Sequence, residues 1–326
     1  MNVSKLYNIA KVILSYTFTW IFKTPIQWGM PIRLSVELTT ACNLRCPQCP
    51  SGLRSFKRPT GHLSMESYCN WIRPLTRHLY SLNFYFQGEP FLHPQIFQAI
   101  KFASKQNILT TSSTNGHFLS SDAVIALIES GLDILTISVD GIDQETYEKY
   151  RIGGKLERVI NGIEQLVIAK RRLSSKTPYI IFQFILFQHN VHQMNEARKL
   201  ARSLGCDEVR FKTAQVYDYS NGSKLIPEES LYARYAEAQS GEYVLKSELP
   251  NRCFRLWNAP VVTWDGQLVP CCFDKDAEYV LGNLQQTSLL EIWNGKKYRS
   301  FRNQMTRDRK AIQICKNCSE GSKIWI

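Results

Sequence analysis

Three cysteines stand close together near the start of the chain, and their spacing suits iron. Cys42, Cys46 and Cys49 form the pattern CxxxCxxC. Three thiolates on one short loop can each bind one iron of a 4Fe–4S cubane, which leaves the fourth iron without a protein ligand. A zinc site with a distant fourth ligand is the alternative, but zinc loops usually use CxxC pairs, and the next histidine is His62. The spacing therefore favours an iron–sulfur cluster.

A second group of cysteines lies towards the end of the chain. It comprises Cys253, the pair Cys271-Cys272, and Cys315-Lys-Asn-Cys318. A secreted disulfide scaffold is usually much shorter than 326 residues and carries a cleavable signal, so close clusters here indicate metal binding. A zinc ribbon is the alternative to an iron–sulfur cluster. We nominate Asp274 as a proton acceptor, with a turn or capping carboxylate as its alternative role.

The elements that must position these residues alternate between strands and helices. Short β-branched or aromatic runs bounded by turn residues predict buried parallel strands at 33–38, 82–86, 108–113, 134–139, 179–187 and 208–212. Helical patterns lie between them at about 64–79, 94–106, 120–130, 155–173 and 191–204. This alternation predicts an α/β fold whose parallel sheet curls into a partial (βα)6 TIM-like barrel.

Polar residues occur at the ends of the first four predicted strands. The first strand runs into the cysteine loop, and Gln87-Gly88-Glu89-Pro90 follows the second. Asn115 follows the third strand, and Ser138 lies at the end of the fourth. In barrel-type sheets the loops at the C-terminal strand ends converge on the active site. We therefore expect the active site at these loops.

In these features, residues 33–213 resemble the radical S-adenosylmethionine (SAM) superfamily. Besides CxxxCxxC, Gln87-Gly88-Glu89-Pro90 looks like that family's Gly-Gly-Glu-Pro motif, with Gln87 in place of the first glycine. Asn115 and Ser138 match its polar positions after the third and fourth strands. Arg151 looks like its arginine that binds the SAM carboxylate.

The resemblance implies a SAM-binding 4Fe–4S cluster on the three cysteines, with SAM chelated at the open iron. Gly88 and Glu89 would hold the SAM amino group, and Asn115 would lie near the ribose or sulfonium. Ser138 and Arg151 would hold the carboxylate, which suits a guanidinium fork. Reductive cleavage of SAM would give a 5′-deoxyadenosyl radical that abstracts hydrogen from substrate. A donor such as flavodoxin or ferredoxin would supply the electron.

The segment from 251 onwards resembles the SPASM/Twitch extensions of radical SAM maturases. The matching features are Asp265-Gly266, Pro270-Cys271, Leu281-Gly282-Asn283 and the closing CxxC. In that family the extension binds an auxiliary 4Fe–4S cluster. The resemblance implies a second cluster on Cys253, Cys271, Cys315 and Cys318, with Cys271 preferred to Cys272 because it follows a proline.

The N-terminal segment is apolar at helical spacing, which predicts a helix with a stripe formed by Leu6, Ile9, Ile13, Tyr16 and Trp20. No run reaches the roughly 20 apolar residues that span a bilayer, and no small-residue cleavage site follows. We expect this helix to pack on the main domain of a cytoplasmic protein. A helix in a membrane interface, with peripheral membrane contact, is the alternative.

The net charge of +12 and pI near 9.2 favour an anionic partner. No nucleic-acid-reading motif accompanies the basic residues, so we expect no nucleic-acid partner. Peptide or protein modification is the commonest role in the SPASM-like group, and we expect a peptide-modifying maturase. A small anionic or lipid-linked metabolite is the alternative substrate. A non-catalytic iron–sulfur or zinc scaffold would explain the cysteines, but not the ordered polar residues at strand ends.

The predicted organisation has four parts. Residues 1–30 form an amphipathic helix, residues 31–213 the partial barrel, and residues 251–326 the SPASM/Twitch-like domain. Residues 214–250 form a linker with some helix, which begins at Pro227.

Overall fold

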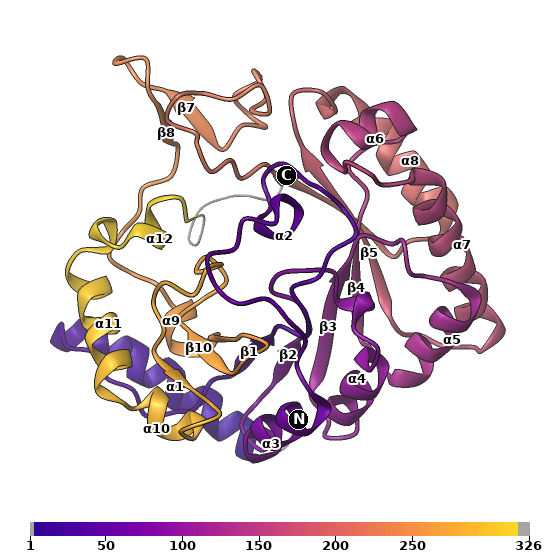
Figure 1. Ribbon diagram of the computed structural model, residues 1–326. Helices are drawn as coiled ribbons and strands as arrows, with labels where there is room; N and C mark the ends of the chain where they lie inside the picture. The colour runs from indigo at the N-terminus through magenta and orange to yellow at the C-terminus, as the bar shows by residue number, and fades with distance from the viewer. Residues whose placement is uncertain (1–2, 319–326) are drawn as a thin grey trace. The chain divides into compact units, whose positions relative to one another are not determined.

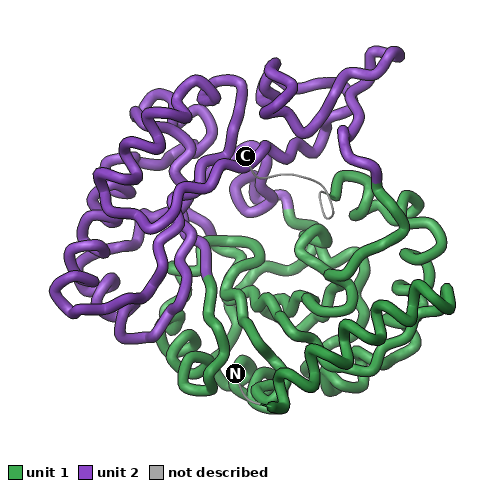
Figure 2. The backbone as a smooth tube through the Cα atoms, turned by 180° about the vertical axis from the view of Figure 1, so that it is seen from behind, with its two compact units in different colours: residues 1–41, 56–111, 249–320 green, residues 42–55, 112–248, 321–326 purple. Residues whose placement is uncertain are grey.

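The computed structural model describes residues 3–318 of the chain (Figure 1). These residues form two compact units that are interleaved in sequence (Figure 2). Unit 1 takes the residues up to 41, then 56–111, and those from 249 onwards, whereas unit 2 takes 42–55 and 112–248. The four predicted ranges do not follow these limits, because each unit gathers segments from distant parts of the chain. Those ranges stay predictions.

Unit 1 is built on a sheet with the strand order β11-β10-β9-β1-β2-β3. Its parallel strands are β1 (Arg33–Val36), β2 (Ser81–Asn83), the first half of β3 (Leu109–Thr114) and β9 (Val261–Val262). The antiparallel strands β10 (Gln267–Val269) and β11 (Gly282–Asn283) extend it. The turn that contains Trp264, Asp265 and Gly266 joins β9 to β10, and Gly266 has a φ of +84°, which suits glycine.

Helices of unit 1 fill the connections between these strands. Ser64 caps α3 (Met65–Ile72) by accepting from Ser67 N, and a Ser288–Glu291 capping box starts α10 (Leu289–Trp293). The others are α4 (Ile96–Ser104), α9 (Arg255–Asn258), α11 (Lys296–Arg307), α12 (Gln313–Lys316), and the short 3₁₀ turns η1 (Arg73–Leu75), η2 (Pro90–Leu92) and η4 (Arg309–Ala311).

Unit 2 repeats the strand–helix alternation. Its parallel strands are β4 (Ile134–Ser138), β5 (Tyr179–Leu186) and β6 (Glu208–Thr213), paired in that order. The predicted helices appear as α5 (Ser121–Ser130), α7 (Leu156–Arg172), η3 (Val191–Gln193) and α8 (Met194–Leu204). The short helices α2 (Pro50–Leu53) and α6 (Gln144–Tyr150) were not predicted.

The segment 214–250 differs from its prediction. No helix begins at Pro227; instead β7 (Tyr235–Glu237) pairs antiparallel with β8 (Tyr243–Leu245). Gly241, with a φ of +81°, lies in the connection between the two strands. Tyr235 and Tyr243 pack with Val216 and Ile226 in a small apolar cluster, so burial of aromatic side chains overrides the helix-start signal.

The N-terminal helix α1 (Val3–Phe22) packs on unit 1 through a face that matches the predicted stripe only in part, since Tyr16 of that stripe packs on Phe254 and Trp257. Leu6 and Ile13 of the predicted stripe are exposed, whereas Lys5, Asn8, Val12, Ser15 and Thr19 are buried. These polar side chains are buried because they form hydrogen bonds with main-chain atoms of unit 1. Asn8 Nδ2 donates to Met30 O (3.0 Å) and its Oδ1 accepts from Met30 N (2.8 Å), while Lys5 Nζ donates to Asn107 O (2.7 Å). Within the described residues, no helix is long and apolar enough to cross a membrane.

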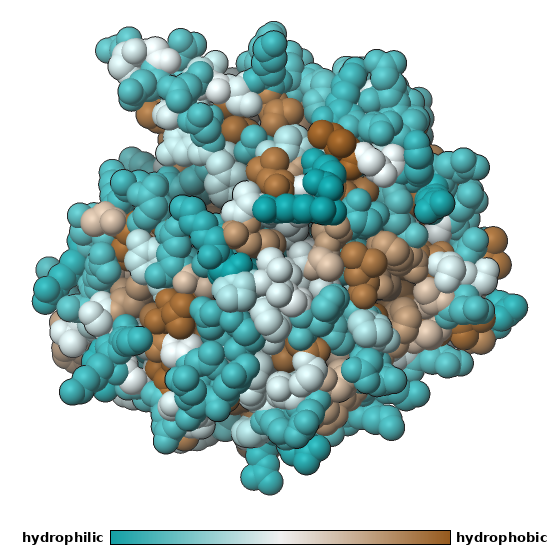
Figure 3. Space-filling view, in the orientation of Figure 1, coloured by the Kyte–Doolittle hydropathy of each residue, from teal (hydrophilic) through white to brown (hydrophobic). Residues whose placement is uncertain are grey.

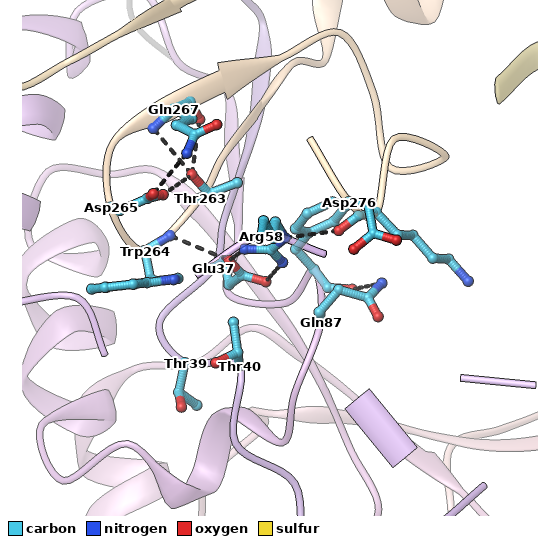
Figure 4. A network of polar contacts seen from close by, with 12 residues as sticks. Glu37, Thr39, Thr40, Arg58, Gln87, Thr263, Trp264, Asp265, Gln267 and Asp276 are labelled. Atoms are coloured by element: carbon cyan, nitrogen blue, oxygen red, sulfur yellow. Dashed lines mark hydrogen bonds and ion pairs between the residues drawn. The ribbon is translucent and has the colours of Figure 1, made fainter. Parts of the chain in front are cut away.

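A buried ion pair fixes the chain where it leaves β1 for the first cysteine loop (Figure 4). Arg58 Nη1 and Nη2 donate to the two oxygens of Glu37 at 2.8 and 2.6 Å, and Arg58 Nε donates to Lys275 O at 2.9 Å. Trp264 N also donates to Glu37. Burial raises the pKa of Glu37, and Arg58 acts in the opposite direction. The pair therefore ties three segments of unit 1 together.

Candidate functional site

The first three cysteines lie on a tight loop of unit 2. Cys49 N donates to Cys46 O (3.3 Å), and Leu53 N of α2 donates to Cys49 O (2.9 Å). A Cβ added to Gly52 would come within 2.6 Å of Cys46 N, so the loop closes tightly around its middle cysteine. Cys46 is buried in an apolar cluster with Tyr150 and Phe187, and Cys42 and Cys49 pack against the same cluster. The structure thus brings the three predicted thiols together.

Arg151 lies beside this loop, at the end of α6. Its Nε donates to Asp140 Oδ2 at 2.6 Å, and its Nη1 lies 3.8 Å from Cys46 Sγ. Desolvation opposes the charge of Arg151, but the buried Asp140 carboxylate raises the pKa of Arg151. Burial raises the pKa of the Cys46 thiol, and Arg151 opposes that change. Asp140 therefore orients a permanent cation towards one predicted ligand.

Asn115 and Ser138 are both held firmly within unit 2. Asn115 Nδ2 donates to Asn43 Oδ1 (2.7 Å), which links the end of β3 to the cysteine loop. Asn115 Oδ1 accepts from His117 N (3.1 Å). Ser138 ends β4, is buried, and pairs with Gln183 of β5. Both residues stand at strand ends, as expected.

Gly88 and Glu89 lie in unit 1. Gly88 has a φ of +73°, and a Cβ there would meet Thr39 O at 2.3 Å, so only glycine fits. Glu89 N donates to Ala41 O (2.7 Å), and its side chain caps η2 by accepting from Phe91 N. Ala41 directly precedes Cys42 in the chain. The loop after β2 is therefore anchored to the residue at which the cysteine loop begins.

The second group of thiols gathers in unit 1. Burial raises the pKa of Cys271 well above its ordinary value, and the charges of Cys272, Cys318 and Cys253 add to this shift. Burial likewise raises the pKa of Cys315 to about 12, with smaller contributions from Cys318 and Cys253. Cys272 packs in the apolar cluster of Phe86, Val261 and Val269. Cys253 and Cys318 thus each interact electrostatically with both Cys271 and Cys315.

Arg309 contacts this second group and was missed at the sequence level. Its Nη2 lies 3.3 Å from Cys318 Sγ, and its Nη1 donates to Arg252 O at 3.0 Å. Desolvation works against the charge, but the Cys318 and Cys253 thiolates raise the pKa of Arg309. Arg309 lies in a basic stretch from Lys296 to Lys310, most of which is exposed, and its burial and its contact with Cys318 become visible only in the fold. Asp140 was also missed, although it follows Ser138 by two positions.

Asp274 occupies a turn beyond the cysteine pair. Its two carboxylate oxygens accept from Glu278 N (2.8 Å) and Tyr279 N (2.9 Å). Burial raises the pKa of Asp274 to about 6, and the two backbone donors oppose that shift. These contacts are those of a turn carboxylate, the alternative role, and proton transfer by Asp274 stays a prediction.

Over residues 3–318, no three His, Cys, Asp or Glu side chains are gathered as closely as the ligands of one metal ion. A cubane binds each thiolate through a different iron, so its ligands stand farther apart than those of a single ion.

Comparison with known families identifies the chain. Residues 36–184 match the sequence model of the radical SAM superfamily. The chain belongs to this superfamily. Residues 253–319 match the SPASM model, an iron–sulfur cluster-binding domain. This radical SAM enzyme therefore uses SAM, a SAM-binding 4Fe–4S cluster and an auxiliary iron–sulfur cluster.

Two curated relatives cover most of this radical SAM enzyme. PqqA peptide cyclase of Gluconobacter oxydans is 27% identical over 316 residues, which are 90% of this chain and 84% of the relative. A tungsten-containing aldehyde ferredoxin oxidoreductase cofactor-modifying protein of Pyrococcus furiosus is 23% identical over 296 residues, 82% of each chain.

Solved structures confirm the predicted fold class. Streptococcus suis SuiB bound to SAM aligns with a TM-score of 0.67 at 16% identity, covering 95% of this chain and 76% of SuiB. A second SuiB structure, bound to its precursor peptide SuiA, gives a TM-score of 0.66 at 14% identity, covering 97% of this chain and 76% of SuiB.

Proposed function

We propose that this radical SAM enzyme modifies a peptide or protein by abstracting a hydrogen atom from an unactivated C–H bond. The observation that carries the proposal is the match to PqqA peptide cyclase, which extends over both the barrel region and the SPASM domain. SuiB, which also binds a peptide, has a similar fold. The net positive charge of the chain favours an acidic peptide, but it favours a small anionic metabolite equally.

The residues present fit the groups that the family requires. Cys42, Cys46 and Cys49 would hold the SAM-binding cluster, since all three pack in or against one apolar cluster of unit 2. In unit 1, the buried Gln87 Oε1 has no hydrogen-bond partner among the described residues. Beside it, Gly88 packs so closely on the chain before the cysteine loop that a Cβ would lie 2.3 Å from Thr39 O. A buried acceptor without a partner suits an ammonium group, such as the amino group of SAM.

When bound, the cluster and SAM supply the one-electron chemistry that generates the 5′-deoxyadenosyl radical. The residues of the chain would bind SAM and orient it. Asp140 fixes the Arg151 guanidinium beside Cys46, so Arg151 would hold the SAM carboxylate next to that thiolate. Ser138 would assist at the end of β4, and Asn115, immobilised by Asn43, would contact the ribose or sulfonium. Gly88 and Glu89 would bind the amino group.

The second cluster would be held by Cys253, Cys271, Cys315 and Cys318. Four thiolates leave no iron open to substrate, so this cluster would serve electron transfer or structure. Arg309 favours iron binding by these four cysteines. Its guanidinium lies 3.3 Å from Cys318 Sγ, and a cation there stabilises the thiolate that an iron requires.

The first experiment measures the iron and sulfide content of the protein. Anaerobically reconstituted protein should hold about eight irons and eight sulfides, as expected for two 4Fe–4S clusters. Replacing Cys42, Cys46 and Cys49 together by Ala should remove half of that iron and abolish 5′-deoxyadenosine formation. The matched control, Cys69→Ala with Cys206→Ala, should keep both, because burial raises the pKa of Cys206 to about 12 and disfavours the thiolate. Stoichiometric zinc without sulfide contradicts the proposal.

The second experiment identifies the substrate by tracing the hydrogen atom that the enzyme abstracts. Candidate peptides, taken from reading frames beside the gene, are synthesised with deuterated side chains and incubated with reduced enzyme and SAM. Deuterium should appear in 5′-deoxyadenosine with one such peptide. Transfer from a deuterated small anionic metabolite, with none from any peptide, would establish the alternative substrate class instead.

A further inference from the structure

Helix α1 turns an apolar face to solvent. Six side chains on it are between 49% and 82% exposed, and we call them the outward face: Val3, Leu6, Tyr7, Ile13, Leu14 and Ile21. At 3.6 residues per turn, these positions lie opposite the buried side of the helix. Hydrophilic side chains predominate on the face of the molecule drawn in Figure 3, so such a stripe is a departure from an ordinary surface.

Polar contacts hold the outward face in this orientation. The buried side of α1 carries Lys5, Asn8 and Thr19, whose side chains bond to main-chain atoms of unit 1. Thr19 Oγ1 accepts from Ile26 N at 3.0 Å. Turning the apolar stripe inwards would break these bonds and leave buried polar groups without partners. The helix is therefore docked through a mixed face, in which Val12 and Tyr16 pack beside these polar groups, and the outward face stays in solvent.

The charged side chains of α1 and of the segment that follows it are all positive. No Asp or Glu precedes Glu37 in the chain. Lys11 Nζ lies 4.4 Å from the centre of the Tyr7 ring, and the exposed Lys23 follows the helix. Trp293 Nε1 donates to Gly29 O at 2.8 Å and so anchors α10 to the segment after α1. The exposed residues Lys296, Lys297 and Arg299 follow directly in α11.

We infer that the outward face of α1 is a membrane-binding surface that docks the enzyme on anionic lipid. An apolar stripe flanked by lysines is the pattern of a helix that lies in the interface of a bilayer. The buried contacts of α1 keep it parallel to the surface of unit 1. A second copy of the chain fits less well, because a symmetric interface would bring the same lysines of both copies together.

The test compares two matched double variants of the full chain with both clusters loaded. Leu6→Glu with Ile13→Glu alters the outward face, whereas Ile168→Glu with Leu231→Glu makes the same charge change at exposed residues of unit 2. Each is incubated anaerobically with vesicles of phosphatidylcholine and phosphatidylglycerol, or of phosphatidylcholine alone, and sedimented. Melting temperature and 5′-deoxyadenosine formation are measured in parallel.

The unaltered enzyme should sediment with the anionic vesicles and much less with the neutral ones. The α1 variant should lose about tenfold or more of its vesicle affinity, with an unchanged melting temperature and unchanged SAM cleavage. The unit 2 variant should bind within about twofold of the unaltered enzyme. Equal losses in both variants would overturn the inference. A second outcome would also overturn it: the unaltered enzyme does not bind vesicles but forms a dimer, and the Leu6→Glu with Ile13→Glu variant is a monomer.

Discussion

The buried Glu37–Arg58 pair offers the sharpest test of how unit 1 is held together. The two side chains are 0% and 4% exposed, and two hydrogen bonds join them. Replacing Arg58 by Met keeps the apolar stem and removes the charge. Loss of one partner of a buried pair costs about 3–5 kcal/mol, because the other charge stays buried without compensation. Arg58→Met should therefore lower the free energy of unfolding by about that amount.

The chain provides a matched control. Lys149 and Glu145 form an ion pair at 3.1 Å whose side chains are 49% and 85% exposed. Lys149→Met should cost only about 0.5 kcal/mol, the range of an exposed pair. The assay is urea unfolding of anaerobically reconstituted enzyme, followed by far-UV circular dichroism, with iron content measured in parallel. The reasoning is refuted if the two variants lose the same amount.

The stability that Arg58→Met removes should depend on pH in a defined direction. Burial already raises the pKa of Glu37, so its contribution to stability is largest below the ordinary Glu pKa and declines as pH rises through the folded value. Without Arg58 that pKa rises further, because the cation that opposed the shift is gone. The loss in Arg58→Met should therefore be smaller at about pH 5 than at about pH 8. Glu37→Gln with Arg58→Met should remove this pH dependence and recover part of the stability.

Three further outcomes follow from single contacts. Arg309→Met should lower the reduction potential of the auxiliary cluster by on the order of 100 mV, the equivalent of one charge-assisted hydrogen bond, in an anaerobic redox titration. Arg151→Ala should weaken SAM binding by up to about 3 kcal/mol in equilibrium dialysis, and unchanged affinity contradicts its assignment. Asp143 caps α6 through Thr146 N (2.8 Å), a bond that lowers the pKa of Asp143. Asp143→Ala should cost about 1 kcal/mol in urea unfolding at neutral pH, less as pH falls through that pKa, and Asp143→Asn should cost little.

The strands of this fold could be predicted because their signal is local. Each predicted run, such as Ile134 to Val139, combines β-branched residues with flanking turn residues, and the observed strands β1 to β6 fall within about three residues of their predictions, whereas β7 to β11 lie outside the predicted runs. The candidate site could be placed because parallel strands present their C-terminal ends to one side. Short helices such as α6, with Tyr147 and Tyr150 buried, carry too few turns for a periodic signal.

The buried face of α1 could not be predicted for a different reason. Two stripes of that helix are regular, one apolar and one polar, and periodicity favours burying the apolar one. The choice depends on Asn107 and Met30, whose carbonyls lie where Lys5 and Asn8 can reach them. Such partners are distant in sequence, so the decision belongs to the tertiary structure. The hairpin near Tyr235 is a similar case, since the cluster with Val216 that stabilises it also forms only in the fold.

The charged groups around the thiols also depend on contacts that form only in the fold. Cysteine spacing is visible in the sequence because loop ligands must be close along the chain. Asp140, by contrast, orients the Arg151 side chain that contacts Cys46, and Arg309, the first residue of the 3₁₀ turn η4, contacts Cys318. A buried arginine needs acceptors, and in each case the fold supplies one that is a predicted iron ligand. Sequence spacing thus predicts which thiols would bind iron, and the buried cations beside them would set the electrostatic environment of that iron.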